Sequence, residues 1–453
     1  ADELYGEKVR GGGPPPEGSA TAAAGALPAV SKSYLYANNK GGVGKSTLLF
    51  NMVSEYAWRH PEVNVLVVDL SLYADSSTLL LGGSRKEDGV QRGRVLLQRI
   101  PPQNKAAGLI SAAVRYAQNR RMATSWWPNR QWFRKKQNSF SFDFARHSVP
   151  LTDYRRNEQS RSGSGGNVPP NLFLSAGGPE LRKAVSAGTW RETCGALRLA
   201  METELNDPDF PQEQSPVGFY VREDKQRQWV VFFDTDHEIH TPHATLALGS
   251  ADKLIIPLSL DENDYDRLFV GEIALFPILE KLYNAGYLKA RIDKLIFNRV
   301  RAVNNAPVFN EADSERILPF TPAQSDLNSI RMITQDLHQR YLRGMYSVFS
   351  DADNVGTNVD RFLKRYVSAL RLVSTAAISL SKINGVPLTQ LSIPGGTTDM
   401  QSENESQGVP TPRSISVGVS NRSPGISAGA VGWKILEPIK KNVNILVQSL
   451  ENN

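Results

Sequence analysis

The sequence of 453 residues predicts an α/β fold in which a mostly parallel sheet carries helices on both faces. First, apolar runs of strand length alternate with segments of helical apolar spacing from Ser33 onward. Second, the runs are continuously apolar, which is typical of strands buried on both faces. Third, a glycine-rich stretch at 37–44 joins the first strand to the first helix.

Each expected element follows from its own stretch of sequence. The apolar runs predict strands over 33–39, 64–71, 171–178, 228–236, 252–259 and 293–300. Helical spacing predicts helices over 46–59, 106–119, 190–204 and 265–286. Residues 301–390 also look helical, with a less regular pattern.

Composition divides the chain into a core domain and flexible ends. Residues 1–32 are rich in Gly, Pro and Ala and predict a disordered tail. Residues 33–392 form the expected domain, interrupted by an insertion at 84–166. Residues 393–430, rich in Gly, Ser, Thr and Pro, predict a flexible linker, and 431–453 predict a C-terminal amphipathic helix.

Composition also excludes several classes of protein. No apolar run reaches the length of about 18–20 residues that a membrane span needs. Cys194 is the one cysteine, so the chain has neither an internal disulfide nor a cysteine cluster for iron. A reducing, cytoplasmic location is the expectation.

The positive charge is concentrated in the insertion. Residues 84–166 contain 17 Lys and Arg against 5 Asp and Glu, a net charge of +12 in a chain whose total is +6. Seven cations lie in 115–136, interleaved with the aromatic residues Trp126, Trp127, Trp132 and Phe133. This pattern suits nucleic acid, docking on a protein partner or on the parent domain, or an anionic membrane. A membrane is the least favoured of the three.

The stretch "ANNKGGVGKST" at 37–47 has the composition of a phosphate-binding loop. Free backbone amides at the start of a helix, together with the helix dipole, attract anions. In such a loop Lys45 reaches the β- and γ-phosphates and the Ser46 hydroxyl binds Mg²⁺. Glycine is usual where this chain has Asn39, and Lys40 follows it.

The segment "NKGGVGKST" resembles the deviant Walker A loop of the ParA/MinD superfamily, P-loop ATPases of the SIMIBI class. The resemblance implies a Rossmann-like P-loop fold, ATP and Mg²⁺ as cofactors, and a homodimer. Lys40 would then contact phosphate across the dimer interface. The resemblance implies that the nucleotide is bound by Lys40, Gly41, Gly42, Val43, Gly44, Lys45, Ser46, Thr47, Asn298 and Arg299.

Further segments resemble the same superfamily in order and spacing. "NVLVVDLSLYADSSTLLLG" resembles its second strand and switch, and "WVVFFDTD" resembles its Walker B strand. The resemblance implies that Asp234 holds a Mg²⁺-bound water. "DKLIFNRV" resembles the strand whose Asn-Arg pair, here Asn298 and Arg299, lies against adenine.

One departure from the family concerns catalysis. The family carries Asp-x-Asp at the end of the second strand, whereas this chain has Asp69 followed by Ser71. A hydroxyl does not readily take a proton from water at neutral pH. The resemblance gives catalytic roles to Lys40, Asp69 and Asp75, and Ser71 predicts weak or missing ATP hydrolysis.

The C-terminal segment has apolar residues on one helical stripe, among them Ile439, Val443 and Leu446. Such a stripe serves either to hold a membrane or to pack on the domain, and we favour packing. By resemblance, the function expected for the chain is an ATP-dependent switch that positions or partitions a cargo with a protein regulator. The alternative is a non-hydrolysing structural or adaptor protein that keeps a bound nucleotide.

Overall fold

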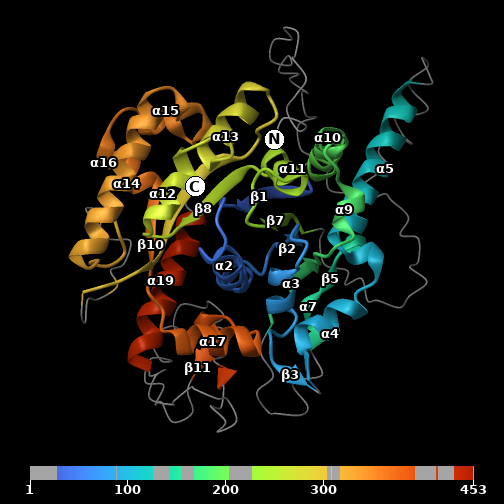
Figure 1. The fold of residues 1–453 in the computed structure, drawn as a ribbon. Coiled ribbons are helices and arrows are strands. Elements are labelled where there is room, and N and C mark those ends of the chain that lie inside the picture. Colours follow the sequence, from blue (N-terminus) through green and yellow to red (C-terminus); the bar gives the residue numbers. More distant parts are fainter. Residues whose placement is uncertain are drawn as a thin grey trace.

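The structure is a computed structural model, shown in Figure 1. It describes residues 28–87, 89–125, 142–155, 168–203, 227–303, 308, 317–392, 415–416 and 433–451. Trp126, Trp127, Trp132 and Phe133 of the basic insertion lie outside these residues.

The centre of the fold is an eight-stranded sheet in the order β10-β9-β8-β1-β7-β2-β6-β5. Its strands are β1 (Val30–Tyr36), β2 (Asn64–Asp69), β5 (Val149–Pro150), β6 (Leu172–Ser175), β7 (Trp229–Asp234), β8 (Lys253–Leu258), β9 (Arg291–Val300) and β10 (Val367–Arg371). All neighbours pair in parallel except β5 with β6. The predicted mostly parallel α/β fold is confirmed, and β1 places its glycine-rich loop in the middle of the carboxyl edge.

Helices cover both faces of the sheet (Figure 1). One face packs against α5 (Ala106–Ser125), α10 (Trp190–Met201), α11 (Pro242–Ser250), α12 (Glu262–Phe269), α13 (Leu275–Asn284), α14 (Gln324–Leu342) and α16 (Val359–Tyr366). The other packs against α2 (Lys45–Arg59), α3 (Asp75–Leu80), α4 (Arg92–Arg99), α17 (Thr375–Asn384) and α19 (Trp433–Glu451). Side chains alternate between the two cores, as Phe232 and Phe233 do on β7.

Short elements complete the described chain. They are the helices α7 (Leu151–Arg155), α9 (Leu181–Ala184) and α15 (Ala352–Val355), and the 3₁₀ turns η1 (Pro102–Asn104), η2 (Ala145–His147), η4 (Met345–Val348) and η5 (Leu388–Gln390). Strands β3 (Lys86–Glu87) and β4 (Val90–Gln91) form one small sheet, and β11 (Leu391–Ser392) and β12 (Ile415–Ser416) form another.

Several predicted boundaries differ from the structure. The helix expected over 265–286 is two helices, α12 and α13, because the chain turns at Gly271 with φ of 88°. Strand β10 lies in the region predicted to be helical. The sheet begins at Val30, ahead of the predicted domain start at Ser33, and β12 lies within the predicted linker.

The described part of the insertion belongs to the core of the domain. Helix α5 runs to Ser125, beyond the predicted end at Asn119. Leu109, Ile110 and Ala113 of α5 are fully buried against the sheet and its helices. Deleting all of 84–166 would therefore open the core.

The C-terminal helix α19 packs on the domain beside α2 and β10 (Figure 1). Its buried stripe consists of Leu436, Ile439, Val443, Leu446, Val447 and Leu450. The Tyr34 hydroxyl donates a hydrogen bond to the carbonyl of Leu450 at 3.1 Å. The helix thus uses its apolar stripe within this chain, as the packing alternative predicts. Among the described helices, none combines the length and apolarity that crossing a membrane requires.

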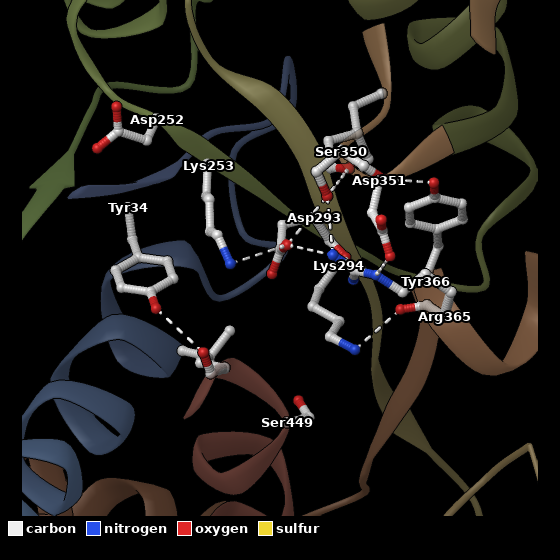
Figure 2. A network of polar contacts seen from close by, with 12 residues as sticks. Tyr34, Asp252, Lys253, Asp293, Lys294, Ser350, Asp351, Arg365, Tyr366 and Ser449 are labelled. Carbon is white, nitrogen blue, oxygen red and sulfur yellow. Dashed lines mark hydrogen bonds and ion pairs between the residues drawn. The ribbon is translucent and has the colours of Figure 1, made fainter. Parts of the chain in front are cut away.

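A buried ionic cluster joins the start of β9 to the end of α16 (Figure 2). The carboxylate of Asp293 is fully buried and lies 3.4 Å from the Lys253 ammonium and 2.8 Å from the Arg365 guanidinium. The Ser350 hydroxyl donates a third contact at 3.0 Å. Burial alone would raise the pKa of Asp293, but Lys253 and Arg365 outweigh it and lower that pKa. The cluster therefore holds a charged carboxylate inside the protein.

Candidate functional site

The phosphate loop connects β1 to α2 at the carboxyl edge of the sheet. Gly42 and Gly44 have φ of 80° and 87°, a left-handed conformation that glycine adopts without steric cost. A side chain at position 44 would also collide with the amide of Asn298, which donates to the carbonyl of Val43 at 2.7 Å. Because α2 begins at Lys45, the unpaired amides of its first turn lie at this loop.

Two asparagines fix the beginning of the loop. The Asn38 amide donates to the carbonyl of Pro257 at 2.5 Å, which ties the loop to β8. The Asn39 amide donates to the carbonyl of Ile273 at 2.6 Å, in the turn between α12 and α13. Asn39 therefore replaces the usual glycine with a side chain that anchors the loop to a neighbouring segment.

The two lysines of the loop occupy different environments. The Lys45 ammonium is nearly buried and donates to the carbonyl of Lys40 at 2.8 Å. The Lys40 ammonium lies 3.0 Å from a carboxylate oxygen of Asp261, which follows β8. Both predicted phosphate ligands thus lie on the loop, with Lys40 paired within its own chain.

Two carboxylates lie side by side beneath the loop. Asp69 ends β2 and Asp234 ends β7; the two residues are paired in register and fully buried. Asp69 accepts hydrogen bonds from the amides of Ser71 and Ser77, both at 2.9 Å, and from the Ser77 hydroxyl at 2.7 Å. Through these hydrogen bonds Asp69 holds the turn between β2 and α3.

Asp234 has a free acceptor that Asp69 lacks. One of its oxygens accepts a hydrogen bond from the Ser76 hydroxyl, and its Oδ1 is buried without a hydrogen-bond partner among the described residues. Burial raises the pKa of Asp234 to about 6, although the Ser76 and Ser46 hydroxyls and the charge of Lys45 act to lower it. Burial and the neighbouring Asp234 likewise raise the pKa of Asp69.

These residues fit a divalent cation. Two adjacent buried carboxylates need a positive charge that balances their negative charge. The unpaired Oδ1 of Asp234 is an oxygen ligand of the kind that Mg²⁺ binds. The Ser46 hydroxyl, the predicted second ligand, lies near enough to Asp234 to lower its pKa. The structure thus brings the two predicted metal ligands together.

The switch segment after β2 is held by Ser71. Its buried hydroxyl accepts hydrogen bonds from the amides of Tyr73 and Ala74, at 3.2 and 3.1 Å. Ala74 has φ of 56°, and α3 begins at the next residue, the exposed Asp75. The negative charge of Asp75 acts to raise the pKa of both Asp234 and Lys382.

A cavity of about 540 Å³, including the part open to solvent, adjoins the phosphate loop. It is lined by Gly42, Gly44, Thr47, Leu48, Asn51, Asn298, Arg299, Leu370, Val373, Ile378, Lys382, Leu388 and Val443. Its lining combines glycines and Thr47 of the phosphate loop and the cations Arg299 and Lys382 with apolar side chains. The predicted Asn298 and Arg299 lie in its wall.

The polar lining of the cavity includes two cations, Arg299 and Lys382. Arg299 has φ of 64°, an uncommon conformation for a residue other than glycine. Burial and the neighbouring charge of Arg299 lower the pKa of Lys382. A cavity lined by the phosphate loop, two cations and apolar side chains suits a ligand that has an anionic part and an aromatic part.

Of the comparisons with known proteins, only the comparison with solved structures finds proteins similar to this chain. No protein-family model matches the sequence, and no curated protein matches it closely. The McdA protein of Cyanothece, a variant in complex with ATP, has a TM-score of 0.40 and 13% identity, covering 79% of this chain and 89% of that one. The chain is similar in structure to ParA-family ATPases.

Two further ParA structures illustrate the similarity. The ParA family ATPase of Chlorobium tepidum has a TM-score of 0.35 and 11% identity, covering 79% of this chain and 90% of that one. The ParA protein of pNOB8, bound to nonspecific DNA, has a TM-score of 0.38 and 13% identity, covering 75% and 85%.

The structure adds site residues that the ParA/MinD resemblance did not point to. Ser76, Ser77 and Asp261 contact predicted residues directly, and Lys382 lines the cavity. The two serines directly follow Asp75, so the sequence placed them close to the switch. Asp261 and Lys382 are brought to the site only by the tertiary fold.

Proposed function

We propose that the chain binds ATP together with Mg²⁺. The observation that carries this proposal is the buried, unpaired Oδ1 of Asp234 beside Ser46 of the glycine loop. Lys45 and the first amides of α2 would hold the phosphates, Ser46 and Asp234 the ion, and Asn298 and Arg299 the base. When bound, the ion would neutralise phosphate charge and fix the orientation of the phosphates.

Calorimetric titration tests this proposal. ATP with Mg²⁺ should bind, and both chelation of the ion and the variant Asp234→Asn should weaken binding. Wild-type protein that shows no heat and no thermal shift with adenine nucleotides would contradict it. The control is Asp360→Asn, which changes an exposed carboxylate on α16.

We further propose that ATP drives formation of a homodimer in which Lys40 of each chain contacts the other's nucleotide. The resemblance of the loop to the ParA/MinD superfamily supports this, as do exposed apolar side chains near the loop. Tyr73, Val270 and Ile273 are 63%, 60% and 50% exposed, which suits a face that another molecule covers. Such a dimer would act as a timed switch that positions or partitions a cargo with a protein regulator. Light scattering with and without ATP tests the dimer.

Hydrolysis should be slow. Ser71 cannot readily accept a proton, and its hydroxyl already accepts two backbone hydrogen bonds. The same observation favours the second candidate function, a structural or adaptor protein that retains an inert nucleotide. A nucleotide that copurifies, does not turn over and does not change the oligomeric state would support the adaptor over the switch.

Nucleic acid is the partner we propose for the basic insertion. In its described part, α4 and α5 carry Arg92, Arg94, Arg99, Arg115, Arg120 and Arg121. Cationic side chains release counterions from nucleic acid, so binding should fall steeply with salt. Because α5 is part of the core, the test is deletion of 126–141 rather than of the whole insertion. Salt-dependent DNA binding that this deletion removes would support the proposal.

A further inference from the structure

The cavity beside the phosphate loop is walled on one side by the C-terminal helix. Val443 of α19 is fully buried and lines the cavity together with Leu370 and Val373. These two residues come from β10 and the turn after it, and Leu388 comes from η5. Helix α19 thus contributes one apolar side chain to the cavity wall, and it does so only while it is docked on the domain.

The docked position of α19 is fixed by a side chain next to Val443. Asn442 is fully buried, and its side-chain oxygen accepts a hydrogen bond from the Arg371 amide at 2.8 Å. Its side-chain nitrogen donates to the carbonyl of Ala369 at 3.0 Å. The amide of Asn442 therefore pairs with the edge of β10 as a neighbouring strand would, and it sets the depth at which Val443 faces the cavity.

We propose that α19 forms part of the nucleotide site, with Val443 packing against the base of the bound nucleotide. This inference rests on the proposed ATP binding, and it identifies α19 as a wall of the pocket that holds the base. In the proposed complex the phosphates would lie at Gly44 and Thr47, and the apolar lining that includes Val443 suits the face of an aromatic base. Because the ligand contacts α19 only in its docked position, binding should stabilise docking.

Two buried valines one turn apart on α19 allow a matched test. Val443 lines the cavity, whereas Val447 is equally buried and does not. Val443→Phe should weaken ATP binding by about tenfold or more, because the larger ring fills space meant for the base. Val447→Phe should disturb packing to a similar degree yet leave ATP affinity within about twofold. Inorganic tripolyphosphate, which has no base, should bind all three proteins alike.

The outcomes separate this inference from ATP binding itself. If the wild-type protein binds neither ATP nor tripolyphosphate, the proposed function fails. If it binds both and Val443→Phe binds ATP as tightly as Val447→Phe does, the assignment of α19 is wrong.

Hydrogen exchange on the wild-type protein covers the case in which Val443→Phe does not fold. Amides of 439–447 should be more protected with ATP than with tripolyphosphate. Equal protection by the two ligands would overturn the inference.

Discussion

The ammonium group of Lys40 lies 3.0 Å from a carboxylate oxygen of Asp261 in the same chain. Lys40 is the residue proposed to reach the nucleotide of a second molecule. Its side chain is 18% exposed, and that of Asp261 is 53% exposed. The pair therefore opposes the proposed role of Lys40, since the contact with Asp261 must be exchanged for one with phosphate.

Asp261→Asn should favour the ATP-bound dimer. Exposed ion pairs contribute at most about 1 kcal/mol each, and the dimer exchanges two of them, so its dissociation constant should fall by up to about 30-fold. Sedimentation velocity with ATP measures this change. Lys40→Ala should prevent dimerisation without loss of ATP binding to the monomer, and a Lys40→Ala protein that dimerises as the wild type does would contradict the role in trans.

Lys45→Ala should weaken ATP binding by about 10- to 100-fold, because it removes a charged hydrogen bond to phosphate. Calorimetry measures the affinity. The matched control is Lys32→Ala, near the other end of β1, which should bind ATP like the wild type. Equal affinities for all three proteins would place the phosphates elsewhere.

Ser71→Asp should raise ATP turnover, because a carboxylate can accept both the amide hydrogen bonds now made to Ser71 and a proton from water. Phosphate release under steady-state conditions is the measurement. Ser71→Ala serves as the control: it should lose about 1 kcal/mol of stability with no gain in turnover. Turnover of the wild type that already matches Ser71→Asp would refute slow hydrolysis.

The attachment of α19 should weaken as pH rises. His60 lies 2.9 Å from Glu451 at the end of α19, and this hydrogen bond, with a second one to Glu62, raises the pKa of His60 above its ordinary value of 6.5. A raised pKa in the folded state means that the contribution is complete below pH 6.5 and is lost as pH rises through the folded value.

Chemical denaturation between pH 6 and pH 9 checks the sign of this effect, which should amount to about 1 kcal/mol. In Glu451→Gln the decline should largely disappear, because the charged partner of His60 in α19 is removed. Stability that instead increases over this range in the wild type alone would show that the sign is wrong.

Asp293→Asn should destabilise the fold by about 3 kcal/mol, because it leaves the partly buried cations Lys253 and Arg365 without their counter-charge. Urea denaturation gives the free energy of unfolding. Since the pKa of Asp293 is lowered, its contribution should persist above pH 3.8 and be lost as pH falls through the folded value. The exposed Asp360→Asn on α16 should change stability little.

Six of the eight strands of the central sheet were predictable because they are apolar runs. The alternation of strands and helices along the chain follows from that pattern, and so does the placement of Asp69 and Asp234 at strand ends. Strand β10 was missed because Val367–Arg371 is short and follows a helix without a turn signal. The break at Gly271 was missed because the apolar spacing continues across it.

The site was less predictable than the fold. The residues of the phosphate loop are contiguous in the sequence, so their spacing alone identifies the loop. Asp261 and Lys382 lie far from the loop in sequence, and no local pattern marks them as neighbours of Lys40 or of the cavity. Val443 was visible only as one member of an apolar stripe, which gives no indication of what the stripe faces.

The hydrogen bonds of Asn442 also affect how this protein responds to proteolysis. They occupy the outer margin of β10, the last strand on that side of the sheet. Proteolytic removal of the C-terminal segment would leave that margin open to strands of other molecules. Clipped protein should accordingly precipitate or form fibrous aggregates on storage, so the intact tail is a safeguard of solubility.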